Sequence, residues 1–280
     1  MKKIVLFLSV ALLSFGIEAQ VKTPQPSPTS KINQVIGLTD VSVEYARPSM
    51  RGRTIYGDLV PYDKLWRTGA NKNTQITFSD DVKVEGKELK KGTYAIFTKP
   101  GKENWEVIFY SDANNWGTPR KWDDTKVAAK ATIKASALPM NVETFTIMFN
   151  DFTMDSAKMY IVWSNVEVGL KIEVPAKKAA IASIEKTMAG PSAGDHYQAA
   201  VFYKEIEDFA KAKEHIDKAI SLRKEPAFWF HRQQSLIYAK TGDKDGAIKA
   251  AKTSLELAEK AGNADYVKLN KDSLAEWGAK

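Results

Sequence analysis

The hydrophobic pattern changes its period near Pro175, and this change most constrains the fold. Before it, apolar residues alternate with polar ones, as Val41, Val43 and Tyr45 do, which is typical of half-buried strands. After it, Ala, Lys and Glu dominate, and Gly and Pro fall mostly at breaks such as Gly190-Pro191. That pattern favours helices. The sequence therefore predicts a β domain over residues 31–175 and a helical domain over 176–280.

The β domain is expected to hold about nine or ten short strands with no helices between them. Turn-prone pairs such as GK, PG, SD and ND separate several of the alternating segments. Many short strands in this spacing favour an antiparallel β-sandwich or a jelly-roll-like domain. Beyond the segments around Val43, Ile76, Ile96 and Val107, strands are expected at 81–85, 126–137, 142–150, 159–164 and 166–174.

The helical domain contains an internal repeat. A shift of 35 residues superposes His196 on His231, Tyr203 on Tyr238 and Ala212 on Ala247. The repeat length, the aromatic residue that ends each first helix and the small Ala early in each second helix resemble the tetratricopeptide repeat family. That resemblance implies stacked helix pairs that contact another protein. Two repeats are fewer than usually stand alone, so we expect them to pack on the β domain or on another copy.

Two further features of the helical domain bear on its packing. A helix over 176–188 is expected to connect the repeats to the β domain. His196 and His231 occupy equivalent places of the repeat, where the resembling family often has Trp. Equivalent places usually serve the same packing, so a catalytic or metal-binding role of these histidines is not expected.

The N-terminal residues resemble an export signal. Lys2 and Lys3 precede a short apolar run that ends near Phe15, and Ala19 offers a small residue for cleavage before Gln20. We predict a signal peptide over 1–19, a Pro-rich linker over 20–30 and a periplasmic or extracellular location. The run is too short for a membrane span, so none is expected in the mature chain. The sequence has no Cys, which excludes disulfides and thiolate chemistry.

The charge balance argues against a nucleic-acid-binding protein. Residues 20–175 carry 21 basic and 18 acidic side chains, and residues 176–280 carry 18 and 15. Neither half has the strongly basic character of a domain that binds nucleic acid. Solvated lysines account for most of the positive balance.

One stretch, residues 45–78, gathers four of the seven arginines beside Trp66. Arg is preferred to Lys where a planar fork meets a carboxylate or phosphate. The residues that we expect to bind an anionic small molecule, peptide or glycan are Arg47, Arg51, Arg53, Tyr62, Trp66, Arg67 and Asn71. Alternatively, the arginines bond to Asp58, Asp63 and backbone carbonyls and Trp66 fills the core. Gly69 and Asn71 equally suit a tight turn and a cap into the next strand.

The elements RPSMRGR, WRTGAN and GTYAIF within residues 31–175 are specific. In them the chain resembles an exported bacterial family, the domain of unknown function numbered 2911, which is often joined to tetratricopeptide-like repeats. The resemblance implies no activity, because the family has none established.

No common catalytic motif occurs in the sequence, and we predict no catalytic residues, metal or cofactor. Asp80, Asp81 and Asp112 lie in turn-like segments that lack the spacing of an EF-hand. We therefore expect an exported binding or scaffold protein whose helical repeats contact a protein partner. A hydrolase acting on an envelope polymer or saccharide, and a purely structural assembly protein, remain the alternatives.

Overall fold

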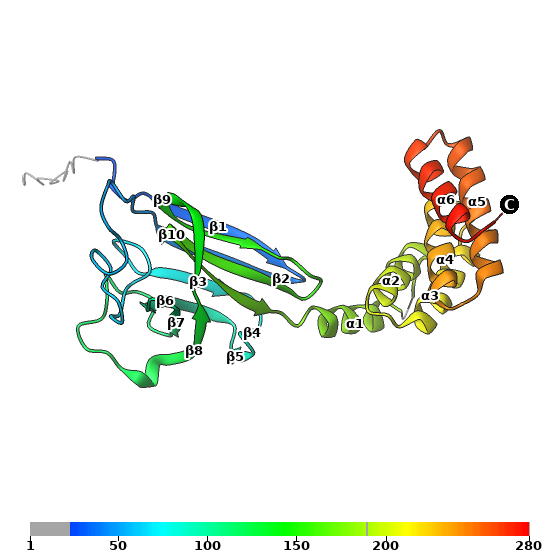
Figure 1. The fold of residues 1–280 in the computed structure, drawn as a ribbon. Coiled ribbons are helices and arrows are strands. Elements are labelled where there is room, and N and C mark those ends of the chain that lie inside the picture. The colour runs from blue at the N-terminus through cyan, green and yellow to red at the C-terminus, as the bar shows by residue number, and fades with distance from the viewer. Residues whose placement is uncertain (1–22, 189, 280) are drawn as a thin grey trace, which may run out of the picture.

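The computed structural model describes residues 23–188 and 190–279. Strands occupy its first part and helices its second, as the change of period at Pro175 predicts (Figure 1). We call residues 29–173 the β part and residues 176–276 the helical part. The predicted signal peptide, residues 1–19, lies outside the described residues. The first strand begins at Thr29, inside the expected linker.

The β part consists of two antiparallel sheets. The first sheet has the order β1-β2-β3-β6-β7-β8 and the second the order β5-β4-β10-β9. The strands of the first sheet are β1 Thr29–Ile36, β2 Thr39–Ala46, β3 Thr74–Phe78, β6 Gly92–Pro100, β7 Asn104–Tyr110 and β8 Val127–Lys134. Those of the second are β4 Val82–Val84, β5 Lys87–Leu89, β9 Ser136–Asn150 and β10 Ser156–Glu173. A short 3-10 helix, Asp124–Lys126, precedes β8.

One hydrophobic core joins the two sheets. Val43 and Ile76 of the first sheet are fully buried in the same cluster as Ile147 and Ile161 of the second. The alternation of burial along β2 follows the sequence pattern, with every second side chain turned into this core. Each such aliphatic side chain stabilises the fold by roughly 1.5–3 kcal/mol.

Strand β10 is longer than expected. The sequence predicts separate strands at 159–164 and 166–174, but the structure has one strand that continues through Ser164. Its pairing with β9 shifts register on both sides of Ser164, whose φ is 54°. The interruption of the alternating pattern therefore marks a β-bulge, where the strand bends without ending.

The chain passes directly from β10 into helix α1, Ala176–Thr187. Ala176 is buried in the core of the β part. Its Cβ lies 2.6 Å from where Gly37 would carry a Cβ, so only glycine leaves room for the start of α1. Figure 1 shows α1 between the sheets and the remaining helices. The repeats are thus set apart from the sheets, and packing against another copy stays a prediction.

The remaining helices repeat at the predicted interval. They are α2 Ala193–Glu205, α3 Phe209–Ser221, α4 Phe228–Lys240, α5 Lys244–Lys260 and α6 Ala264–Glu276. Both α2 and α4 have 13 residues and begin 35 positions apart, as α3 and α5 also do. Asp208 and Asp243, the N-caps of α3 and α5, accept bonds from equivalent backbone amides. Among the described helices, none is long and apolar enough to span a membrane.

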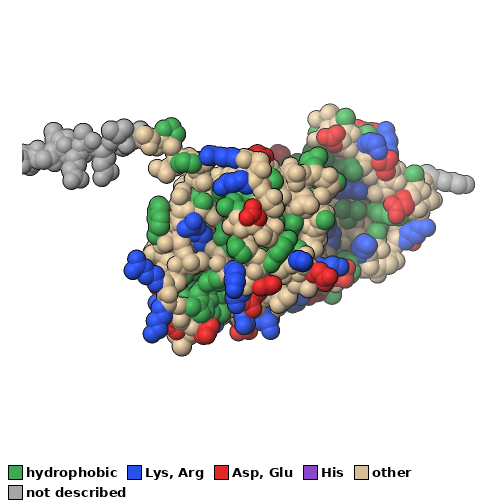
Figure 2. Space-filling view, turned by 60° about the vertical axis from the view of Figure 1, so that its left-hand side comes forward, with side chains coloured by type: hydrophobic (Ala, Val, Ile, Leu, Met, Phe, Trp, Pro, Cys, Tyr) green, Lys and Arg blue, Asp and Glu red, His purple; other side chains and the backbone are tan. Residues whose placement is uncertain are grey.

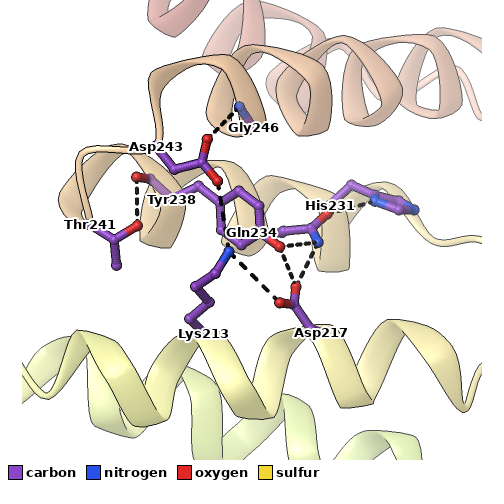
Figure 3. Close-up of polar contacts among 8 residues, drawn as sticks. All are labelled: Lys213, Asp217, His231, Gln234, Tyr238, Thr241, Asp243 and Gly246. Carbon is purple, nitrogen blue, oxygen red and sulfur yellow. Dashed lines mark hydrogen bonds and ion pairs between the residues drawn. The ribbon is translucent and has the colours of Figure 1, made fainter.

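Tyr203 and Tyr238, equivalent in the repeat, end in different surroundings. Tyr203 is 4% exposed and stacks on His215. Tyr238 is half-buried, and its hydroxyl donates to Asp217 Oδ1 at 2.7 Å. The Nζ atom of Lys213 lies 3.2 Å from the centre of the Tyr238 ring (Figure 3). Helix α3 is therefore joined to α4 by a cation–π contact and a charge-assisted hydrogen bond.

The two repeat-equivalent histidines also differ. His196 Nδ1 lies 2.9 Å from His215 Nδ1, whereas His231 faces Gln234. Of two imidazoles in one hydrogen bond, one donates and the other accepts, so at most one can be fully protonated without losing the bond. Burial lowers the pKa of both His196 and His215. The positive charge of Lys218 lowers the pKa of His196 further, and that of Lys211 lowers the pKa of His215. Glu214 opposes the shift in both cases.

Truncation of the repeat tyrosines tests the packing of the helical part. We expect Tyr203→Ala to cost about 3 kcal/mol or more, because it removes a buried aromatic ring. Tyr238→Ala should cost a comparable amount, since it removes both the ring on Lys213 and the bond to Asp217. Urea unfolding followed by circular dichroism measures both, with exposed Leu222→Ala as the control at less than about 0.5 kcal/mol. Equal stability of all three variants would contradict the packing described here.

The histidine pair predicts a dependence of stability on pH. A histidine whose pKa is lowered on folding binds fewer protons in the folded state, so stability falls as pH drops through about 6.5. Melting temperature should therefore decrease between pH 7.5 and 5.5. His215→Gln should reduce the dependence of melting temperature on pH. Leu222→Ala, which replaces an exposed residue that does not titrate, should leave this dependence unchanged. Carboxylates whose pKa is lowered on folding, such as Asp195, change the stability only at lower pH, below their ordinary pKa of 3.8.

Candidate functional site

The long segment between β2 and β3 is held on the β part by Trp66. The Trp66 backbone exchanges two hydrogen bonds with Thr98 of β6, at 2.8 and 2.9 Å. Its indole Nε1 donates to the Gly69 carbonyl at 3.2 Å. The ring lies against Trp105, Trp163 and Phe145, with centroid distances between 5.4 and 6.4 Å. Trp66 thus fixes the segment to both sheets.

Backbone strain accompanies this attachment. Thr68 has a φ of 56° although it is β-branched and fully buried, and such residues rarely adopt the left-handed conformation. Its hydroxyl lies 3.1 Å from that of Thr98, and its carbonyl accepts from Thr74. Asn71 has a φ of 57° and donates from Nδ2 to the Ser27 carbonyl. Strain of this kind persists where the surroundings fix the conformation, often at functional sites.

A cleft opens beside Trp66, and we call it the Trp66 cleft. It has a volume of about 270 Å³ and is lined by Leu59, Val60, Pro61, Lys64, Leu65, Trp66, Arg67 and Thr118. Two of these side chains are cationic and none is acidic. Within the described residues, neither Lys64 nor Arg67 makes a side-chain hydrogen bond or ion pair. The cleft therefore presents two unpaired cations beside an indole edge.

The structure divides the four predicted arginines between two roles. Arg47 donates from Nε to the Phe145 carbonyl at 3.1 Å and from Nη2 to the Thr146 hydroxyl at 2.9 Å. These bonds join the end of β2 in one sheet to β9 in the other. Arg51 and Arg53 are exposed. Arg67 is half-buried and lies in the cleft.

Arg51 and Arg53 bond to backbone carbonyls. Arg51 Nη2 donates to the Pro26 carbonyl at 3.0 Å. Arg53 donates to the carbonyls of Met50 and Ser49 at 2.9 and 2.7 Å. The expected bonds to Asp58 and Asp63 do not occur among the described contacts; carbonyls are the acceptors instead. These two side chains stabilise the turn at Ser49–Arg53 while keeping part of each fork exposed to solvent.

The other predicted site residues lie around the cleft. Tyr62 packs its ring edge against Gly57, where a Cβ would come within 2.7 Å of the ring, and it borders the segment that forms the cleft wall. Asn71 lies on the far side of the WRTGAN turn, outside the lining of the Trp66 cleft. Thr118, which sequence reasoning missed, reaches the cleft from the segment after β7. No pattern in the sequence marks that approach.

Two aspartates between strands of the β part form ion pairs with lysines. Asp81 binds Lys90 at 2.9 Å, and Asp112 binds Lys126 at 3.0 Å. The bond from Lys90 lowers the pKa of Asp81, and that from Lys126 lowers the pKa of Asp112. Across residues 23–188 and 190–279, no group of three or more His, Asp or Glu side chains is placed to hold a metal ion. Figure 2 shows basic and acidic side chains side by side along the lower edge of its face.

A family model described as "Protein of unknown function (DUF2911)" matches residues 27–172. The chain belongs to this family. The match spans both sheets and the Trp66 cleft, and it ends before α1. No curated protein and no solved structure matches the chain.

Tyr56 offers a test of the aromatic cluster beneath the cleft. Its ring contacts Trp66 and Trp105, and its buried hydroxyl has no hydrogen-bond partner. Burial raises the pKa of this phenol. We expect Tyr56→Phe to leave stability unchanged or to raise it by about 1 kcal/mol, because an unsatisfied buried polar group is removed. Thermal unfolding measures the change, and a loss of more than about 1 kcal/mol would show that the hydroxyl has a stabilising partner.

Proposed function

We propose that this protein is an exported binding protein that recognises an anionic group in the Trp66 cleft. The observation that carries the proposal is the pairing of two free cations, Lys64 and Arg67, with an indole in a cleft that no carboxylate lines. A guanidinium with no partner inside the protein keeps its planar fork for a carboxylate or a phosphate. The bonds and burial of Thr68, the next residue, fix the backbone that carries the Arg67 guanidinium before any ligand binds.

The architecture that we propose for this function is a β-sandwich-like domain joined to tetratricopeptide-like repeats. The common core of the two sheets supports the first. The 35-residue spacing of α2 with α4 supports the second. Export rests on the sequence of residues 1–19 alone. On the charge pattern, the partners we propose are a small anionic molecule, peptide or glycan rather than nucleic acid.

We further propose that the helical part contacts a protein. A cleft of about 490 Å³ opens between the ends of α2 and α4 and the C-terminal end of α6. Phe209, Leu236 and Trp277 give it apolar walls, and Lys204, Lys240 and Glu276 surround them with charge. An apolar floor within a charged rim is the composition of many protein interfaces.

The hydrolase alternative finds less support. A cleft of about 330 Å³ at the end of β10 includes the carboxylates of Asp81, Glu88, Asp155 and Glu173. Glycoside hydrolysis needs one carboxylic acid whose pKa is raised, so that it can donate a proton. The contact with Lys90 instead lowers the pKa of Asp81. Asp81 is therefore not suited to be the acid, and the unpaired cations of the Trp66 cleft favour noncovalent binding instead.

Arginine-to-lysine changes separate binding from structure. We expect Arg67→Lys to keep the melting temperature and to weaken anion binding by about tenfold, since one fork–anion bond is lost. Arg47→Lys is the matched control. It should leave binding intact but destabilise the fold by about 1 to 3 kcal/mol, because the Phe145 carbonyl loses its partner.

Calorimetric titration with inorganic phosphate, an acetylated aspartyl peptide and oligogalacturonate measures the binding. Thermal unfolding of the same samples measures stability. If wild-type protein binds none of these probes, and Arg67→Lys is destabilised as much as Arg47→Lys, then Arg67 is a structural residue and the proposal is wrong.

A further inference from the structure

Trp116 is the most exposed large apolar side chain in the described part of the chain, with 78% of its surface open to solvent. Burying an indole stabilises a folded protein by several kilocalories per mole at about 25 cal/mol per Å². Trp116 contributes little of this stabilisation, because most of its surface stays in water. The remaining six tryptophans of the sequence include Trp105 and Trp163, each 1% exposed. Trp116 therefore stands apart from the tryptophans that form the core.

Hydrogen bonds fix the backbone at Trp116 and before it. Lys72 and Trp116 form an antiparallel bridge. Buried Asn73 holds the preceding residue: its Oδ1 accepts from the Asn115 amide at 2.8 Å, and its own amide donates to the Asn115 carbonyl at 3.1 Å. Asn73 also donates from Nδ2 to the Ala113 carbonyl. Buried Asn73 thus fixes the backbone that leads into Trp116, so the exposed indole projects from an ordered segment.

A second cleft lies against this indole, and we call it the Trp116 cleft. Its volume is about 270 Å³, and its lining is Gln25, Thr29, Glu44, Tyr45, Ala46, Asn71, Lys72, Asn73 and Trp116. It shares no lining residue with the Trp66 cleft. Trp116 lines one cleft and Thr118 the other, and Gly117 joins these two residues in the chain. A Cβ added to Gly117 would lie 3.0 Å from Arg67 Nη1.

The Trp116 cleft keeps polar groups with free bonding capacity. Glu44 lies across from Lys31 on β1 and from Gln75 on β3, yet its carboxylate forms no ion pair within the described residues. Asn71 uses its amide nitrogen on the Ser27 carbonyl, so its Oδ1 is available to accept. The cleft therefore offers a flat apolar ring with hydrogen-bond acceptors beside it.

We propose that the Trp116 cleft binds a saccharide. A sugar ring has an apolar face of C–H groups that packs on an indole, and its edge carries hydroxyls that donate to acceptors such as Glu44 and Asn71 Oδ1. A purely apolar ligand would displace water from Glu44 and Asn71 Oδ1 without offering either of them a hydrogen bond. The lining carries one anion, Glu44, and one cation, Lys72, so its net charge favours neither an anionic nor a cationic ligand. A neutral sugar can contact both the indole face and the hydrogen-bond acceptors. This site is separate from the anion site in the Trp66 cleft.

Titration calorimetry of the full chain with cellohexaose, maltohexaose and chitohexaose tests this inference. Wild-type protein should bind at least one of them with a Kd below about 10 mM. Trp116→Ala should weaken that binding by at least about tenfold with an unchanged melting temperature, and Trp116→Tyr should restore part of it. Glu44→Gln should weaken it by a smaller factor, since a neutral acceptor remains.

Trp229→Ala provides the matched control, because Trp229 is also exposed, at 37%, but lies in the helical part. It should bind the saccharide as wild type does. Arg67→Lys should also leave saccharide binding unchanged, so failure here is distinguishable from failure of the anion proposal. The inference is overturned if none of the three oligosaccharides binds, or if Trp116→Ala binds as tightly as wild type.

Discussion

The packing of Trp66 into the aromatic cluster determines how the family domain presents its surface. Tyr56, Trp105, Phe145 and Trp163 surround the indole, and they come from the segment after β2 and from strands of both sheets. The 27 residues between β2 and β3 hold no regular strand of their own, and a segment of this length would ordinarily be mobile. Its attachment through the Trp66 ring and the backbone bonds to Thr98, together with the bonds of Arg47 and Asn73 at its two ends, gives the Trp66 cleft a defined shape. The neighbouring strain at Thr68 is tolerated for the same reason.

Much of the fold could be predicted because hydrophobic period reports which face of an element is buried. The connecting helix expected at 176–188 is α1, and the 35-residue repeat gives helices that begin at the expected offset. The pattern was wrong where it divided β10, since a bulge at Ser164 interrupts alternation without ending the strand. The close approach of Ala176 to Gly37, which anchors the start of α1 on the sheets, is a contact that periodicity does not encode.

The candidate site was less accessible to sequence reasoning. The clustering of arginines marked a segment but not the separate roles within it, because whether an acceptor lies within reach of Arg47 or of Arg67 depends on the tertiary structure. Trp116 gave no sequence signal at all, since the same residue type is buried at Trp105. Equivalent positions such as His196 and His231 acquired different partners because their neighbours at 215 and 234 are not repeat equivalents.

The junction at Ala176 has a mechanical consequence. Helix α1 has 12 residues, which corresponds to a spacer of about 18 Å, and its first residue is anchored against Gly37 instead of hanging from a flexible tether. A flexible linker would let the ends of the molecule sample many separations. A helical spacer that starts in a hydrophobic core allows fewer separations. The length of α1 therefore sets the effective concentration of a ligand bound on the sheets relative to a ligand bound on the helices. Figure 1 shows the two sheets and helices α2–α6 at opposite ends of α1.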